Sequence, residues 1–497
     1  MKPLALSEIA RMTGGRLHGA DRIVDAVATD SRAMPSTGGA LFVALKGERF
    51  DGHDHVAAAA AGGAVAALVS RQLDAALCGG AMPQVVVGDT ERALAALAAE
   101  LQRTRRGKVV AITGSNGKTT VKALLLTVLQ RSGKAYANPG NRNNEIGLPL
   151  AVIDAPDDAD FAIYEMGAGK PGDIAYLTAV VRPDVSLVNN IAPAHLERMG
   201  SLLGVADTKA AIYDALPGDG VAVINADDAF APYFAERAHG RRLLRFGIES
   251  SADVTARDIR AGEESTRFLL TAPQGSAEVA LPLPGRHNVR NALAAAALAL
   301  GAGVAFEDVV AGLQAAQPVA GRLVRHPLPG GALLIDDSYN ANPGSLNAAI
   351  DTLAAGQGEA WLVLGDMREL GADGEVLHAE AGRRAKAAGI ARLYALGALS
   401  AHAAAAFGEN ARGFESHAAL ADALRNDIDT ASVGTASAAI GSPDGGRTPQ
   451  VAAEAAPTKA APTKAAVLRI LVKGSRGSAM DRIVAALLDE RGNAHAA

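Results

Sequence analysis

The sequence has little of what marks a secreted or a nucleic-acid-binding protein. It contains one cysteine, Cys78, among 497 residues, so an intrachain disulfide is excluded and a reducing, cytoplasmic location is expected. The formal net charge is −5, which gives no basic footprint of the kind that attracts nucleic acid. Nucleic acid is therefore not an expected partner.

Long apolar runs are absent as well. The longest, residues 292–306, is rich in alanine and shorter than the ~20 residues that a membrane-spanning helix needs, so we expect a buried core helix there and no membrane insertion. The first eight residues show no apolar stretch typical of a signal peptide. Aromatic residues make up only 4% of the chain, against 54 glycines, and this balance favours packed α/β layers over a β-sandwich.

One stretch carries the clearest chemical signal. Residues 108–112 are an apolar, β-branched run that predicts a buried strand, and residues 121–131 have the apolar spacing of a helix. Backbone N–H groups of the glycine-bearing turn between them would cradle a phosphate. Lys118 would reach the β- and γ-phosphates, and the Thr119 hydroxyl would ligate Mg²⁺. The expected ligand is ATP, held by Thr113, Gly114, Ser115, Asn116, Gly117, Lys118, Thr119 and Thr120.

The spacing of this turn differs from a standard Walker A motif. Only two residues separate Gly114 from Gly117, where the standard motif has four before its Gly-Lys. A helix-capping glycine turn with a chance lysine is the alternative. The order of strand, turn, Gly-Lys-Thr-Thr and helix favours the phosphate site.

The length suits about three domains of ~150 residues each. We expect a smaller N-terminal α/β domain over residues 1–106, a central P-loop domain over 107–317, and a C-terminal Rossmann-like α/β domain over 318–497. Apolar strand patterns alternate with helical ones, which predicts doubly wound, mostly parallel sheets. The expected strands are 40–44 and 85–87, then 109–112, 161–164, 185–188 and 221–224, then 333–336, 361–364, 393–396 and 470–472.

Residues 430–466 break this alternation. They are rich in Ala, Ser, Thr, Pro and Gly and contain a repeated Ala-Pro-Thr-Lys. Such a segment has too few large apolar side chains to offset the entropy of ordering it. We expect a disordered insertion that acts as a solvated spacer, with a functional tether as the alternative.

Ligands of open α/β sheets bind beyond the carboxyl ends of the strands, so the residues after each strand are candidates. Glu165 follows residues 161–164 and is a natural second ligand for Mg²⁺ bound to ATP; the alternative is a helix cap or a solvated acid. His195 follows the next strand, but a lone histidine is more often structural.

Lys209 occupies an unusual position. Val205, Lys209, Ile212 and Leu216 fall on the apolar stripe of one predicted helix. Burial would depress the pKa of this lysine and leave a neutral amine, whereas most such lysines extend to the surface instead.

The C-terminal strands also end in polar segments. The expected strand 333–336 leads into an Asp-Ser-Tyr-Asn-Ala-Asn-Pro segment that begins at Asp337, and 470–472 leads into Lys473-Gly-Ser-Arg476. Asp337, an acid suited to binding a ribose, and the cations Lys473 and Arg476, suited to binding a carboxylate, should thus meet at one edge of the C-terminal sheet. We expect that edge to face the P-loop domain.

Six segments together resemble the ATP-dependent Mur ligases of peptidoglycan synthesis. They are the shortened phosphate loop 113–120, the asparagine-rich segment 140–149, the segment 283–291, the segment 336–343 with 365–371, and residues 472–476. The resemblance covers essentially the whole chain apart from residues 430–466. It implies an amide ligase that adds D-alanyl-D-alanine to UDP-N-acetylmuramoyl-tripeptide through an acyl phosphate, releasing ADP and phosphate.

The resemblance also implies roles for individual residues. Glu165 would ligate the Mg²⁺ of ATP, and His195 would help to hold a second Mg²⁺. Lys209 would be carbamylated by CO₂, and its new carboxylate would support the second ion. The implied catalytic set is Lys118, Glu165, His195, Lys209 and Arg322, of which Glu165, His195 and Lys209 join Thr119 as metal ligands. Further nucleotide contacts would come from Asn288 and Asn291 near adenine, Arg322 near the γ-phosphate and Asp337 near the ribose. Substrate contacts would come from Ser31, Arg32, Lys46, Asn141, Asn143, Asn144, Asn340, Asn342, Lys473, Ser475 and Arg476.

Two alternatives remain at this stage. Another ligase of the same superfamily, such as a different Mur ligase or a folylpolyglutamate synthase, would share the phosphate loop; segments 337–343 and 472–476 argue against it. A P-loop ATPase without ligase chemistry would hydrolyse ATP regardless of any amino-acid substrate. We expect a monomer.

Overall fold

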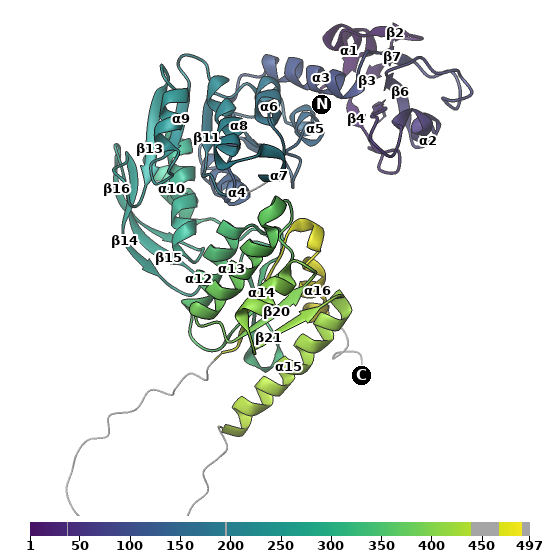
Figure 1. Ribbon diagram of the computed structural model, residues 1–497. Helices are drawn as coiled ribbons and strands as arrows, with labels where there is room; N and C mark the ends of the chain where they lie inside the picture. Colours follow the sequence, from purple (N-terminus) through teal and green to yellow (C-terminus); the bar gives the residue numbers. More distant parts are fainter. Residues whose placement is uncertain (37, 194–195, 439–466, 490–497) are drawn as a thin grey trace, which may run out of the picture. The chain divides into compact units, whose positions relative to one another are not determined.

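The computed structural model describes residues 1–36, 38–193, 196–438 and 467–489 (Figure 1). The chain divides into two compact units, Met1–Gln317 and Pro318–Ala497. Two large sheets lie in the first unit and one in the second. These sheets are mostly parallel and covered by helices, so the predicted α/β class is confirmed. The assignment of three domains stays a prediction.

The first sheet has five strands in the order β2-β7-β6-β5-β4. Only β2 runs antiparallel to its neighbour, and a short antiparallel pair, β1 and β3, lies outside the sheet. The strands are β1 Leu4–Ala5, β2 Arg16–His18, β3 Ile23–Val24, β4 Ala26–Ala28, β5 Ala40–Val43, β6 Ala64–Val69 and β7 Gln84–Val86; the helices are α1 Leu6–Thr13, α2 Val56–Ala61 and α3 Thr90–Thr104.

Cys78 belongs to the core beneath this first sheet. It is 1% exposed and packs with apolar residues of β5, β6 and α2. Burial, aided by the negative charge of Asp74, raises the pKa of its thiol. The side chain therefore behaves as a small hydrophobic residue with little thiolate character.

The second sheet has nine strands in the order β16-β15-β14-β13-β12-β11-β8-β10-β9. Pairing is parallel from β9 to β14 and antiparallel across β14, β15 and β16. The strands are β8 Lys108–Thr113, β9 Ala135–Ala137, β10 Phe161–Glu165, β11 Val185–Val188, β12 Val221–Asn225, β13 Arg242–Gly247, β14 Val254–Ala261, β15 Thr266–Ala272 and β16 Gly275–Leu281.

Helices cover both faces of this sheet. Val109 and Ala111 pack into one core with α3, α6 and α8, whereas Val110 and Ile112 pack into another with α4, α10 and α11. This follows from the two-residue period of a strand, since neighbouring side chains point to opposite faces. A strand buried on both faces has a continuous apolar run, as β8 has from Val109 to Ile112. The helices are α4 Lys118–Leu129, α5 Gly147–Asp154, α6 Asp173–Val181, α7 Leu196–Met199, α8 Leu202–Asp214, α9 Ala231–Arg237, α10 Arg286–Gly301 and α11 Phe306–Gln314.

The second unit contains a six-stranded sheet in the order β17-β18-β22-β19-β20-β21. Only β17 pairs antiparallel. Helices α12, α13 and α14 pack on one face, and α15 and α16 on the other. The elements are β17 Val324–Pro327, β18 Leu333–Asp337, α12 Pro343–Ala354, β19 Ala360–Gly365, α13 Gly374–Ala387, β20 Arg392–Leu396, α14 Ser400–Phe407, β21 Ala411–Phe414, α15 His417–Ala438, β22 Arg469–Lys473 and α16 Asp481–Leu488.

Helix α15 corrects the predicted start of the insertion at residue 430. Leu420, Leu424 and Ile428 are buried along one side of this helix, and the helix continues to Ala438. Extending an anchored helix costs far less than starting one, and alanine is the best helix former. Residues 430–438 are therefore helical, and the rest of the expected insertion, 439–466, lies outside the described residues.

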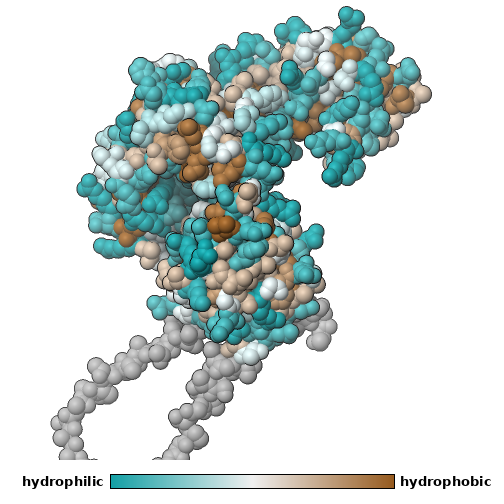
Figure 2. All heavy atoms as spheres, in the orientation of Figure 1, coloured by the Kyte–Doolittle hydropathy of each residue, from teal (hydrophilic) through white to brown (hydrophobic). Residues whose placement is uncertain are grey.

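The described helices include none with the length and apolarity to cross a membrane. On the face shown in Figure 2, hydrophobic residues form small groups within a largely hydrophilic surface. The predicted core helix at 292–306 is confirmed for its first part: α10 is buried from Ala292 to Leu300, and a second helix, α11, starts at Phe306.

Candidate active site

The turn between β8 and α4 has the geometry of a phosphate loop. Gly114 and Gly117 have φ angles of 145° and 79°, in the left-handed region that favours glycine. Helix α4 begins at Lys118, so the N–H groups of its first turn, which includes Thr119 and Thr120, open onto the loop. The Lys118 ammonium donates to the carbonyl oxygen of Gly114 at 2.7 Å. It therefore lies across the loop.

Asparagine side chains fix this loop. The N–H of Asn116 donates to Oδ1 of Asn190 at 2.8 Å, and Nδ2 of Asn189 donates to the Asn116 carbonyl at 2.8 Å. Asn189 also donates to Oδ1 of Asn291 at 3.3 Å. A Cβ atom on Gly117 would lie 2.4 Å from that Asn291 oxygen, so the packing requires glycine at this position.

Thr113 and Ser115, at the start of the loop, are also held by hydrogen bonds. Ser115 exchanges hydrogen bonds with Ala192, donating to its carbonyl oxygen at 3.1 Å and accepting from its N–H at 3.0 Å. The hydroxyl of Thr113 donates to the Met166 carbonyl at 3.0 Å. The loop is thus held to the segments that follow β10 and β11.

Asn288 and Asn291 lie in the first turns of α10, and both are buried. Nδ2 of Asn291 donates to Oδ1 of Asn288 at 3.3 Å, and Nδ2 of Asn288 donates to the Pro284 carbonyl at 2.8 Å. The structure thus brings Asn291 against the phosphate loop, with Asn288 next to it.

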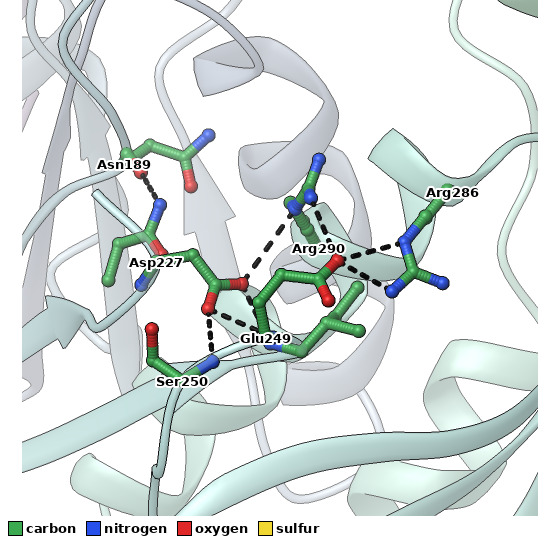
Figure 3. A network of polar contacts seen from close by, with 8 residues as sticks. Asn189, Asp227, Glu249, Ser250, Arg286 and Arg290 are labelled. Atoms are coloured by element: carbon green, nitrogen blue, oxygen red, sulfur yellow. Dashed lines mark hydrogen bonds and ion pairs between the residues drawn. The ribbon is translucent and has the colours of Figure 1, made fainter. Parts of the chain in front are cut away.

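Figure 3 shows the polar network that fixes the start of α10. The backbone N–H groups of residues 248–250 donate to the carboxylate of Asp227 at 2.7–3.0 Å. Burial raises the pKa of Asp227, but these hydrogen bonds outweigh it and the pKa is lowered. Glu249 accepts from Arg286 at 2.6 Å and from Arg290 at 3.4 Å. Sequence reasoning missed this network because its members lie far apart along the chain.

Glu165 ends β10 as a buried carboxylate. Nζ of Lys122 lies 3.1 Å from its Oε2, and Nδ2 of Asn143 donates to its Oε1 at 3.1 Å. Burial raises the pKa of Glu165, but the charges of Lys122 and Lys118, with the hydrogen bonds, outweigh it and lower the pKa. The side chain is therefore ionised at neutral pH.

Lys122 is a residue that sequence reasoning missed. It is 7% exposed and donates to the carbonyl oxygens of Asn138 and Gly140 at 2.9 and 3.0 Å. Through these bonds it ties the phosphate-loop helix to the asparagine-rich segment. The available signal was its spacing, since a lysine four residues after Lys118 lies on the same side of the helix.

Lys209 is 1% exposed on α8, so the alternative in which its amine extends to the surface is wrong. Within the described residues it has no hydrogen bond or ion pair. Burial, with the nearby charge of Lys118, lowers the pKa of Lys209 to about 7, although Asp173 acts in the opposite direction. Half of the amine is thus neutral near neutral pH. His195 lies outside the described residues.

Three of the four expected metal ligands, Thr119, Glu165 and Lys209, lie in the described part of the chain. Within the described ranges, no three histidine, cysteine or acidic side chains form a group that could hold a metal ion. Oε2 of Glu165 faces only the Lys122 ammonium, at 3.1 Å, and the Thr119 hydroxyl has no hydrogen-bond partner within the described chain. A carboxylate and a hydroxyl suit Mg²⁺, which takes its remaining ligands from water and phosphate. These two residues therefore fit the ion.

The predicted substrate residues of the first unit lie in two regions. Asn143 contacts Glu165, whereas Asn144 accepts from the N–H of Gly147 at the start of α5 at 2.8 Å and Asn141 is exposed. In the first sheet's region, the Arg32 guanidinium donates two hydrogen bonds to the Asp30 carboxylate, at 2.7 and 2.9 Å. Ser31 is half-buried beside it, and Lys46 is exposed.

In the second unit, Lys473 and Asp337, each predicted to bind a ligand, are hydrogen-bonded to each other. Nζ of Lys473 donates to Oδ2 of Asp337 at 2.5 Å and to the Asn340 carbonyl at 3.0 Å. Lys473 is 1% exposed. Burial lowers its pKa, and the nearby Arg322 acts in the same direction, while Asp337 opposes both. The Lys473 ammonium is thus committed to internal acceptors.

Two further predicted residues have structural partners. The Ser475 hydroxyl donates to the Ala341 carbonyl at 3.1 Å and accepts from the Arg368 N–H at 2.9 Å. Asn342 caps α12, accepting from the Ser345 N–H at 2.9 Å. Neighbouring Asn340 is exposed. These contacts shape the loops at the carboxyl ends of β18 and β22.

Comparisons with known proteins cover almost the entire chain. Three family models match: "Mur ligase family, catalytic domain" over residues 24–102, "Mur ligase middle domain" over 112–299, and "Mur ligase, glutamate ligase domain" over 321–442. The chain is 42% identical over 488 residues to the UDP-N-acetylmuramoyl-tripeptide–D-alanyl-D-alanine ligase of Escherichia coli K12, covering 98% of this chain and 99% of that protein.

Solved structures of Mur ligases also superpose on almost the whole chain. MurF from Acinetobacter baumannii superposes with a TM-score of 0.86 at 33% identity, covering 98% of this chain and 99% of that one. MurF ligase from Thermotoga maritima, solved in complex with ADP, superposes with a TM-score of 0.76 at 25% identity, covering 94% and 99%.

Proposed function

The chain belongs to the Mur ligase family, and from this premise we propose that it joins D-alanyl-D-alanine to UDP-N-acetylmuramoyl-tripeptide, converting ATP to ADP and phosphate. The observation that carries the proposal is the 42% identity to the Escherichia coli ligase of that name across 98% of the chain. The level of this identity, and not only the length of the match, favours this activity over that of a different Mur ligase. The product is a peptidoglycan precursor, made in the cytoplasm by a monomer.

The first step transfers the γ-phosphoryl group of ATP to the free carboxylate of the tripeptide, giving an acyl phosphate and ADP. Lys118 and the N–H groups at the start of α4 bind the phosphates and offset the charge that develops on them. Lys118 first has to exchange the Gly114 carbonyl for phosphate oxygens. Arg322 supplies further positive charge toward the γ-phosphate.

Mg²⁺, when bound, withdraws charge from the phosphate oxygens and fixes their geometry. Glu165 and Thr119 are the described residues that would hold it, with His195 proposed at a second ion. Glu165 suits this role because its carboxylate is ionised.

Lys209 is proposed to carry a carbamate. Its neutral amine adds to the carbon of CO₂, a C–N bond forms, and a proton is released, so that a cation becomes an anionic carboxylate. The burial of the amine and a pKa near 7 support this chemistry, because an ammonium has no lone pair to donate.

In the second step the amine of D-alanyl-D-alanine attacks the acyl carbon, forms the amide bond and expels phosphate. Arg476 is the better candidate to hold the dipeptide carboxylate, since its guanidinium is exposed and pairs only loosely with Asp481 at 3.5 Å. Lys473 supports the site indirectly through its bond to Asp337.

The experiment that tests the proposal measures phosphate release from ATP with UDP-linked tripeptide, with and without D-alanyl-D-alanine. We expect release to require both, and a new amide product by mass spectrometry. Release that is indifferent to the dipeptide would favour a P-loop ATPase, and release driven by another amino acid or by glutamate would favour a different ligase of the superfamily.

A further inference from the structure

Tyr339 lies between two arginines to which the proposed function gives separate tasks. Its side chain follows β18, and its ring lies under two guanidinium groups. The ring centroid is 4.5 Å from Cζ of Arg322 and 5.7 Å from Cζ of Arg476. Both distances are within the ~6 Å at which a cation is attracted to the face of an aromatic ring.

The backbone holds Tyr339 in this place. Its N–H donates to the carbonyl oxygen of Gly321 at 3.3 Å. Gly321 has a φ of 69°, and a Cβ atom there would lie only 3.0 Å from Cβ of Tyr339. The segment that carries Arg322 thus packs closely against the segment that carries the ring.

Other contacts of the two guanidinium groups are weak. Within the described residues, the Arg322 guanidinium has no hydrogen bond or ion pair, and its Nε is buried without a partner. Arg476 has one loose ion pair, to Asp481 at 3.5 Å, between side chains that are 64% and 52% exposed. Lys473, in contrast, donates two hydrogen bonds, to Asp337 and Asn340. The aromatic ring is therefore the main feature that restricts both arginines.

We infer that Tyr339 is a positioning residue whose ring fixes the guanidinium groups of Arg322 and Arg476, so that phosphate recognition and dipeptide recognition depend on one aromatic side chain. This inference rests on the proposed function, which assigns the γ-phosphate to Arg322 and the dipeptide carboxylate to Arg476. An arginine loses considerable side-chain freedom on binding an anion. A ring that restricts it beforehand reduces that loss, while the N–H edges of the guanidinium stay available.

The phenolic oxygen is not part of the inference. It makes no hydrogen bond or ion pair with the described part of the chain, so the ring alone carries the effect. Tyr339→Phe is therefore the matched control, since it keeps the aromatic face, and Tyr339→Leu is the test variant, since it keeps apolar bulk and removes the face.

The test compares the KM values of all three substrates in the full-length wild type, Tyr339→Phe and Tyr339→Leu. We expect the leucine variant to raise the KM for ATP and for D-alanyl-D-alanine about tenfold each, and to leave that for the UDP-linked tripeptide unchanged. The phenylalanine variant should match the wild type. In an Arg476→Ala background, adding Tyr339→Leu should leave the KM for D-alanyl-D-alanine unchanged.

Several results would overturn the inference: a leucine variant with wild-type constants, equal losses in the leucine and phenylalanine variants, or a rise confined to one substrate. A rise for all three substrates together with a lower melting temperature would reveal a merely structural role. If the leucine variant does not fold, Tyr339→Met provides the same comparison. A wild type that releases no phosphate in response to D-alanyl-D-alanine would instead refute the proposed function.

Discussion

Lys209 and Lys122 are both buried lysines of the first unit, yet their surroundings differ. Lys122 has two carbonyl oxygens and a carboxylate as partners. Lys209 has no such partner within the described residues, and its pKa falls to about 7. A buried lysine without acceptors is expected either to lose its proton or to be modified.

Lys209→Ala should lower turnover by about a hundredfold or more, because the variant cannot form the proposed carbamate. Binding of ATP should change little, since it rests mainly on the phosphate loop. Formate or acetate at high concentration should restore part of the activity by replacing the carbamate oxygens. The measurements are the turnover number with and without formate, and nucleotide affinity by calorimetry.

Two controls accompany this series. Lys209→Arg should be inactive and insensitive to formate, because a guanidinium stays cationic and cannot add CO₂. The exposed Lys134→Ala should behave as the wild type. An active Lys209→Arg variant would show that Lys209 carries no carbamate.

Among the secondary-structure elements, α4 and β10 are joined by the ion pair of Lys122 and Glu165, and hydrogen bonds of both side chains reach the asparagine-rich segment. Replacing Lys122 with Met would leave the Glu165 carboxylate buried without its cation, which costs about 3–5 kcal/mol when one partner of such a pair is removed. We expect that loss in the free energy of unfolding, measured with urea. Lys122→Met combined with Glu165→Gln should recover much of it, and Lys134→Met should cost almost nothing. Equal losses in the single and double variants would contradict this account.

Helix α13 is tied to the loop after β19 by His378, which is fully buried. Its Nε2 accepts from the Met367 N–H at 2.9 Å, and its Nδ1 lies 2.6 Å from the Gly374 carbonyl. Burial lowers the pKa of His378 from 6.5, so the unfolded chain binds a proton at pH values where the folded chain does not. Its contribution to stability is complete above pH 6.5 and declines as the pH falls through 6.5.

A His378→Gln variant should therefore show a flatter dependence of the free energy of unfolding on pH below about 6.5. The measurement is urea unfolding at a series of pH values in both proteins. Identical slopes would mean that His378 does not titrate differently in the folded and unfolded states.

How far the sequence predicts these elements depends on their burial. Strands β8, β10 and β11 are buried on both faces, and their largely apolar runs mark them clearly. Strands β14 to β16 were missed because exposed polar residues alternate with buried ones, and antiparallel hairpins lie outside the β-α-β pattern. The phosphate loop was readable from local spacing. Lys122 and Asp227 were not, since their partners come from distant segments that only the folded chain brings together.

For the molecule as a whole, the composition of residues 439–466 predicts a spacer. Because α15 continues to Ala438, a deletion that tests this prediction should begin beyond the helix. Removing residues 443–462 should leave the melting temperature and the ligase activity close to those of the full chain. Removing 431–438 as well should lower the melting temperature. A large loss from the shorter deletion would refute the spacer prediction.

The burial of Cys78 makes it practical to measure motion of the two compact units with labels on introduced cysteines. Cys78 is the only cysteine of the chain, it is 1% exposed, and its thiol is a poor nucleophile. Maleimide dyes or nitroxide spin labels should therefore not react with Cys78 under native conditions. Cysteines introduced at one exposed position in each compact unit could then be labelled without removing the native residue. Single-molecule fluorescence or electron paramagnetic resonance on such pairs would report how the separation of the two units responds to each substrate in turn.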